Sequence, residues 1–171
     1  MKCLECGAAM KVSTETYKYK ESGLPNVTLQ DIEVRRCPSC GEHEPVIPNI
    51  AGLHAAIAKL LILEPSLLLP AEIRFLRKHL GWSSVDFAKM MSVAPETVSR
   101  WENGHDRIGP ISDKLLRLLV NNLKPAERYP IDLFANMQAT VEAHRLSLRE
   151  KGGLWTEDEA VSPSLPPVST P

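Results

Sequence analysis

Apolar residues recur every three or four positions through the centre of the chain, which is the spacing of a buried helix face. One such pattern covers residues 49–63, with Asn49 placed to cap the helix. A second covers residues 70–80 and begins at a proline, a residue that suits the first helical position. A third, over residues 111–123, is expected to turn four leucines inward: Leu115, Leu116, Leu118 and Leu119. The helical signals predict an all-α domain of five helices over residues 70–124, preceded by a helical connector over residues 47–69.

Residues 84–104 contain two shorter helical patterns separated by a tight turn, and Ser83 is placed to cap the first. The small side chain of Ala88 would let the two helices cross at close range. The outward positions of the second helix carry hydrogen-bonding side chains, namely Glu96, Thr97, Ser99 and Arg100. This is the layout of a helix-turn-helix whose second helix enters a DNA major groove. The alternative is a helical bundle whose polar face is only solvated. It is disfavoured because the tight turn, the close helix crossing at Ala88 and the helix stop at Gly104 occur together.

The first 46 residues follow a different pattern. Strand-like runs cover residues 10–20 and 27–36, and the turn-forming residues 22–25 lie between them. A β-hairpin is therefore expected here. The fold class predicted for the chain is α+β, with a zinc-ribbon-like hairpin domain over residues 1–46 and the helix-turn-helix domain after it.

All four cysteines lie in this first block, in two C-x-x-C pairs: Cys3, Cys6, Cys37 and Cys40. Four thiolates at this spacing are typical of a structural Zn²⁺ site, because a two-residue gap lets one tight turn direct both sulfurs at one ion. The βαβ pattern of a thioredoxin-type dithiol does not surround either pair, and four thiolates leave no open position for catalysis. His43 could replace one ligand, but a surface position is the simpler interpretation. We expect one structural Zn²⁺ per chain.

Composition adds limits on function. The chain of 171 residues has a net charge of −1, so it has no global signature of polyanion binding. Residues 70–124 are nevertheless mildly basic and residues 125–171 acidic. Neither an amino-terminal apolar leader nor an apolar run long enough to span a membrane is found in the sequence, which favours a cytoplasmic protein. The sequence offers no nucleophile–base constellation and no glycine-rich phosphate loop, so we predict that the protein is not an enzyme.

The carboxyl-terminal part gives weaker signals. An amphipathic helix is predicted within residues 125–150, extending from 131 to 148, and the proline- and serine-rich residues 151–171 are expected to be disordered. Trp155 is interpreted as an incidental exposed aromatic residue.

The stretch Ser84 to Gly104, SVDFAKMMSVAPETVSRWENG, resembles the Cro/phage-repressor type of helix-turn-helix, the XRE family. Joined to an amino-terminal CxxC…CxxC, it is similar to the MqsA antitoxins with their YgiT-type zinc finger. The resemblance covers residues 1–124. It implies DNA base contacts by Arg100, Glu96 and Thr97, and phosphate contacts by Ser84, Ser99, Asn103 and Arg107. It also implies a structural ion pair between Arg77 and Glu102.

Three positions depart from the family pattern. Ser92 occupies a turn position usually held by glycine, and a left-handed residue there costs about 1–2 kcal/mol. Ala94 replaces the expected hydroxyl cap, a loss of about 1 kcal/mol. Glu96 stands where the relative carries a neutral amide, so the target DNA sequence cannot be taken from that relative.

Two hypotheses follow. In the first, the protein is a sequence-specific transcriptional regulator that binds a palindromic operator in double-stranded DNA as a homodimer, because one short helix reads too few bases. It could then be the autoregulating antitoxin of a type II toxin–antitoxin pair. In the second, the protein is primarily a toxin-neutralising interaction module with secondary DNA binding.

Overall fold

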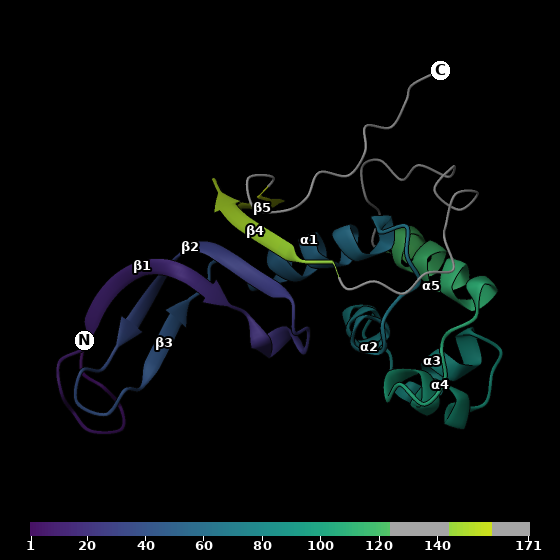
Figure 1. The fold of residues 1–171 in the computed structure, drawn as a ribbon, viewed down its shortest axis with the longest axis horizontal. Helices are drawn as coiled ribbons and strands as arrows, with labels where there is room; N and C mark the ends of the chain where they lie inside the picture. Colours follow the sequence, from purple (N-terminus) through teal and green to yellow (C-terminus); the bar gives the residue numbers. More distant parts are fainter. Residues whose placement is uncertain (124–143, 159–171) are drawn as a thin grey trace, which may run out of the picture.

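The computed structural model describes residues 1–123 and 144–158. Within these ranges the strands lie at one end of the long axis and four of the helices at the other, with α1 between them (Figure 1). The strands are β1 Lys11–Lys18, β2 Val27–Arg36, β3 His43–Val46, β4 Leu146–Lys151 and β5 Leu154–Glu157. The helices are α1 Ile50–Leu63, α2 Pro70–His79, α3 Ser84–Met90, α4 Pro95–Glu102 and α5 Pro110–Leu123, and a short 3-10 turn, η1, covers Lys20–Ser22. The predicted α+β class is confirmed, with a sheet and a helical part that contains the helix-turn-helix.

The predicted hairpin is formed by β1 and β2, which pair antiparallel with a shift in register between Glu15 and Tyr17. The strand order is β1-β2-β4-β5, with β3 also paired to β2. Besides β1, two different strands therefore pair with β2. Its second half, from Glu33, is antiparallel to β3, while its first half, from Val27, is parallel to β4. The chain thus returns to the sheet after completing the helical half.

The return of the chain corrects the expectation for the carboxyl-terminal part. Leu146 and Leu148, predicted to end a helix, lie in β4 and are buried between β2 and β5. Gly152 and Gly153 have φ values of 60° and 87° and turn the chain into β5, so residues 151–158 are ordered. The rest of the predicted helix, up to residue 143, and residues 159–171 lie outside the described residues.

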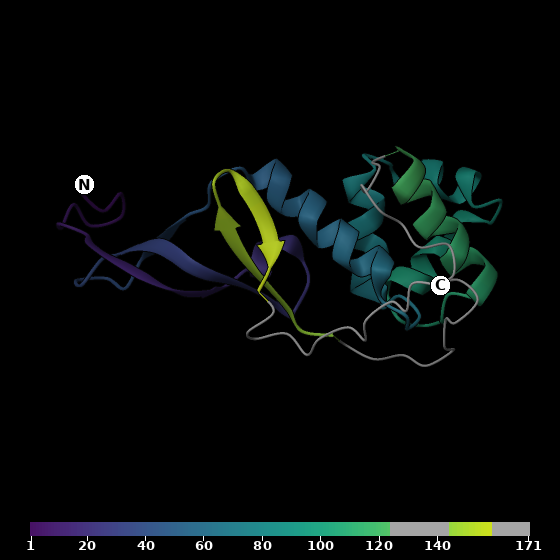
Figure 2. The same cartoon turned by 90° about the horizontal axis from the view of Figure 1, so that it is seen from above.

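Trp155 is part of the core, which corrects its interpretation as incidental. Its side chain is 7% exposed, and its indole Nε1 donates a hydrogen bond to the carbonyl of Pro48 at 3.0 Å. Strand β5 lies against α1 (Figure 2). The carboxyl-terminal hairpin therefore fixes the connector helix to the sheet.

Helix α1 joins the two halves through a continuous apolar core. Asn49 caps it as predicted, its Oδ1 accepting a hydrogen bond from the Gly52 amide at 3.0 Å. The buried face of α1 belongs to one cluster that extends from Leu29 and Val34 in the sheet to Leu76 and Phe87 in the helical half. His54 on α1 is half-buried, and its Nε2 lies 2.9 Å from the Tyr19 hydroxyl. Four helices lie within residues 70–123, and α1 is the fifth that packs with them.

The face of α5 that packs on the other helices differs from the predicted one. Leu116 is buried as expected, whereas Leu115 and Leu118 are 36% and 43% exposed. Asp113 and Arg117 take their place in the interior with no exposed surface. None of the helices in the described residues is long and apolar enough to cross a membrane.

Arg117 connects α5 to the end of α1. Its Nη1 donates to the carbonyls of Leu61, Ile62 and Glu64 at 3.1, 3.0 and 2.5 Å, and its Nη2 donates to the carbonyl of Ser66 at 2.7 Å. Its Nε donates to Asp113 Oδ1 at 2.6 Å. The last carbonyls of a helix have no hydrogen-bond donor within that helix. Here the Arg117 guanidinium donates to carbonyls at the end of α1 and just after it. This contact fixes the connector against the helix-turn-helix half.

Candidate metal centre and nucleic-acid interface

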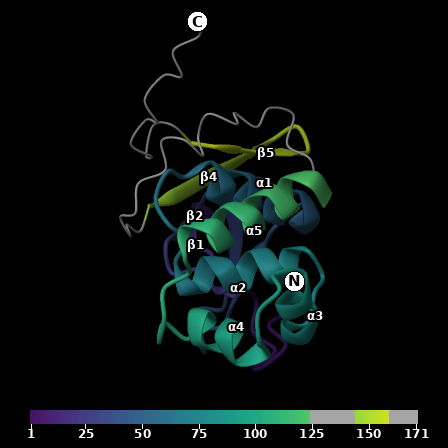
Figure 3. The same cartoon turned by 90° about the vertical axis from the view of Figure 1, so that its right-hand side faces the viewer.

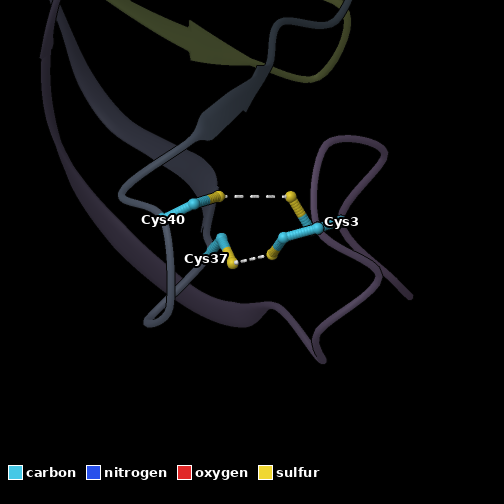
Figure 4. A group of neighbouring side chains, drawn as sticks. Cys3, Cys37 and Cys40 are labelled. Carbon is cyan, nitrogen blue, oxygen red and sulfur yellow. Dashed lines mark hydrogen bonds between the residues drawn. The ribbon is translucent and has the colours of Figure 1, made fainter.

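The four cysteines meet at the end of the sheet remote from the helices. Cys3 and Cys37 are buried, and Cys6 and Cys40 are exposed. Figure 4 shows Cys3, Cys37 and Cys40 converging from two separate loops. The Sγ atoms of Cys3 and Cys40 are 3.6 Å apart, those of Cys6 and Cys37 are 3.3 Å apart, and all four lie within 4.8 Å of one another.

Both cysteine loops have the same backbone design. The amide of Gly7 donates to the carbonyl of Cys3 at 2.9 Å, and the amide of Gly41 donates to that of Cys37 at 3.0 Å. The two glycines have φ values of 73° and 78°, in the left-handed region that residues with a Cβ rarely adopt. The loops therefore turn back on themselves and direct two sulfurs each at a common point.

The donor set fits a tetrahedral thiolate site. With a Zn–S distance of about 2.3 Å, the sulfurs of such a site are roughly 3.8 Å apart, close to the separations found here. Backbone hydrogen bonds from Cys40 and Ser39 lower the pKa of the Cys37 thiol to about 6, whereas side-chain hydrogen bonds within the cluster raise the pKa of Cys6 and Cys40. His43 lies in β3 with its ring against Tyr17, at a centroid distance of 6.3 Å. The four cysteines alone can hold a metal ion such as zinc.

At the other end of the molecule, α3, a tight turn and α4 form a helix-turn-helix (Figure 3). Ser83 caps α3 as predicted, its Oγ accepting from the Asp86 amide at 3.1 Å. Ala88 is 1% exposed and accepts a hydrogen bond from the Val93 amide, which closes the turn. Ser92 adopts a φ of 54°, so the strain expected at this position is present. Ala94 precedes α4 without a side-chain cap, also as expected.

The outward face of α4 presents the side chains that the sequence assigns to base reading. Glu96 and Arg100 are exposed, and Thr97 is half-buried at the start of the helix. Arg100 lies in the last turn, where its Nη2 donates to Asp106 Oδ1 at 3.0 Å and its Nε also donates to Asp106. Sequence reasoning did not single out Asp106.

The four residues assigned to phosphate contact are all exposed: Ser84, Ser99, Asn103 and Arg107. Two of them are already linked, because Asn103 Nδ2 donates to Ser99 Oγ at 3.2 Å. Asn103 Oδ1 in turn accepts from Arg74 Nη2 at 2.9 Å. Arg74 was not singled out by sequence reasoning either, and it gives this group a positive charge.

Arg77 and Glu102 lie in contact, as the sequence suggested. Arg77 Nε donates to Glu102 Oε1 at 2.6 Å, and Nη2 donates to Oε2 at 3.1 Å. Arg74 also contacts Glu102, with its Nη2 donating to the backbone carbonyl at 2.9 Å. The buried carboxylate therefore joins α2 to the end of α4 and holds α4 in place.

Comparison with known proteins agrees with this geometry. Residues 73–124 match the helix-turn-helix family, so this segment is an XRE-type helix-turn-helix domain, the class found in DNA-binding transcription regulators. The match begins within α2, ends just after α5 and does not include the cysteine loops. No curated protein and no solved structure matches the chain.

Proposed function

We propose that this protein is a sequence-specific DNA-binding transcriptional regulator, most simply a repressor, with a structural zinc site. The observation that carries the proposal is the exposed face of α4 in the helix-turn-helix domain, where Glu96, Thr97 and Arg100 lie side by side. A guanidinium there can bond guanine O6 and N7 together, and a carboxylate can accept from cytosine N4. The bonds from Arg74 and Arg77 to Glu102 support a rigid presentation of this face.

Selection of binding sites from random double-stranded DNA by the zinc-loaded protein tests the proposal. The expected result is one preferred sequence, and failure to enrich any sequence would contradict it. The Arg100→Ala variant should lose about 1–3 kcal/mol on the preferred site and little on random DNA, because it removes a base contact. The measurement is the dissociation constant for both DNAs at several salt concentrations.

Arg107→Ala is the matched control. Because Arg107 is assigned to phosphate, its loss should weaken binding to both DNAs equally and reduce the salt dependence by about one counterion. Equal loss on both DNAs for Arg100→Ala would instead remove Arg100 from the base-reading role.

The surface of α5 supports binding as a homodimer to a palindromic site. Ile111, Leu115 and Leu118 follow one another at helical spacing, and their exposed fractions are 85%, 36% and 43%. This apolar stripe lies opposite the α5 face that Leu116 and Arg117 bury. A second copy of the chain would cover it and place two reading helices on one duplex.

Leu118→Glu is expected to weaken self-association at least about 100-fold, because a two-fold interface would bury two unpaired carboxylates. Sedimentation equilibrium or light scattering over a concentration series measures the effect. Ile50→Glu, at a position of α1 that is 52% exposed, is the control and should leave association unchanged. A Leu118→Glu protein with unchanged association would place the dimer contact elsewhere.

A second candidate function is the neutralisation of a toxin protein, and the zinc end of the molecule favours it. Met1, Leu4 and Val12 are 66%, 95% and 63% exposed near the cysteine loops. Apolar side chains gathered at a solvent-facing end suit contact with another protein. Together with the resemblance to MqsA antitoxins, this supports the role of a type II antitoxin that represses its own operon.

Co-expression with a small toxin-like protein encoded next to this one tests this second function. A complex that co-purifies, and that Leu4→Glu disrupts while DNA binding persists, is the expected outcome. Leu154→Glu on β5, where the leucine is 70% exposed, is the control and should leave the complex intact. A neighbouring protein that fails to bind the wild-type chain would exclude the antitoxin role and leave the regulator.

A further inference from the structure

Arg100 is held by a carboxylate from the loop that follows its own helix. Both oxygens of Asp106 accept hydrogen bonds from the guanidinium, one from Nε and the other from Nη2 at 3.0 Å. The two side chains are 56% and 45% exposed, so the pair lies at the surface. The proposed function places this surface against DNA. The hydrogen bonds from Arg100 hold the pKa of Asp106 below its usual range, and the carboxylate is ionised at neutral pH.

The loop places Asp106 by backbone contacts. The amides of His105 and Asp106 donate to the carbonyl of Arg100 at 2.9 and 3.2 Å. On the far side of the loop, Ile108 is 2% exposed and anchors the chain in the core. The carboxylate is therefore fixed relative to the last turn of α4.

The geometry of the pair leaves the other edge of the guanidinium available. A guanidinium carries five N–H donors, and the contact with Asp106 uses the Nε donor and one on Nη2. The two donors of Nη1 and the remaining one on Nη2 face away from the carboxylate. An adjacent Nη1 and Nη2 pair is a suitable donor set for guanine O6 and N7.

We propose that Asp106 is a positioning residue that sets the base specificity of Arg100 by holding its guanidinium with the Nη1–Nη2 edge directed at a guanine. This inference rests on the proposed DNA-binding function and deepens it. The ion pair restricts the arginine before binding, so less side-chain freedom is lost on DNA.

The test compares the wild type with Asp106→Asn in the full-length, zinc-loaded protein. Asparagine has the same shape but cannot accept both hydrogen bonds, because its amide nitrogen is a donor. We expect discrimination between the preferred sequence and the one with its Arg100-dependent guanine replaced to fall about tenfold. Affinity for random DNA should stay equal or rise a few-fold, since one negative charge is removed. Thermal unfolding should be unchanged because the pair is exposed.

Three further variants make the result specific. Glu44→Gln removes the same charge from the sheet end and should leave discrimination unchanged. In an Arg100→Ala background, Asp106→Asn should cause no further loss of discrimination, since the residue acts through Arg100. Asp106→Ser repeats the test with a side chain that cannot form the bidentate contact.

Each outcome has a distinct meaning. Unchanged discrimination in Asp106→Asn would overturn the positioning role while leaving the regulator intact. Increased affinity for the preferred sequence with discrimination retained would show that Asp106 competes with DNA for Arg100, which also overturns it. If the wild-type protein selects no DNA sequence, the result contradicts the proposed DNA-binding function and the positioning role that rests on it.

Discussion

Replacing Arg117 by methionine is expected to destabilise the protein by about 3–5 kcal/mol, because removing one member of a buried ion pair leaves an uncompensated charge. Asp113 and Arg117 have no exposed surface, and Asp113 Oδ2 also accepts from the Leu68 amide at 2.7 Å. Methionine fills a similar volume, so the loss comes from hydrogen bonding and charge rather than from a cavity. A loss of this size is a large part of the roughly 5–15 kcal/mol that stabilises a typical domain.

Urea unfolding followed by circular dichroism measures this effect. Lys59→Met, at an exposed position of α1, is the control and should shift the midpoint little. Asp113→Asn in the Arg117→Met background should recover part of the loss, because it removes the stranded charge, while the carbonyls at the end of α1 stay without their donor. A cost below about 1 kcal/mol for Arg117→Met would mean that water satisfies those carbonyls equally well.

The importance of Arg117 could not be predicted from its surroundings in the sequence. In the run from Lys114 to Leu119 each charged residue is followed by two leucines, so the leucine positions alone do not show which face of the helix is buried. The choice depends on the end of α1, whose last carbonyls accept from Arg117 and lie more than fifty positions away in the chain. Pairs of distant polar groups of this kind are not visible in a pattern of three- and four-residue spacing.

Local signals were more reliable. The caps at Asn49 and Ser83 and the strained turn at Ser92 each depend on neighbouring residues only, and each was predicted correctly. The carboxyl-terminal hairpin also has a local signal, a Gly-Gly pair between two strand-forming runs, which is typical of a two-residue turn. It was missed because the leucines nearby also fit a helix. The strand is favoured over a helix because the first half of β2 has an edge that β3 does not pair with, and β4 pairs there.

The residues of the candidate sites also fall into two groups, those predicted from local spacing and those that depend on tertiary packing. Cysteine spacing was sufficient to predict the four-sulfur cluster, because each C-x-x-C loop is a local structure. The outward face of α4 followed from helical spacing alone. The partners Arg74 and Asp106 did not, since their contacts with Asn103 and Arg100 depend on how α2 and the loop after α4 pack.

Removal of zinc, by a strong chelator or by Cys37→Ser, is expected to unfold the cysteine loops and the sheet end that carries them. Structural zinc contributes about 10–16 kcal/mol of binding free energy in small zinc domains, and that energy is coupled to folding. The apolar core limits the damage, however. Strand β2 is held at its first half by β4, and Leu29 is buried in the cluster that includes α1.

Hydrogen exchange should therefore give a graded result. On chelation, amides near Cys3 and Cys37 and in β3 should lose protection, while amides of α2 to α5 keep theirs. Affinity for the selected DNA should change little, because α4 lies at the opposite end of the long axis (Figure 1). Ser39→Ala, next to Cys40, is the control and should retain both metal and protection. Loss of protection throughout the helices would show that the continuous core makes the two ends one cooperative unit, and unchanged protection everywhere would exclude a structural role for the metal.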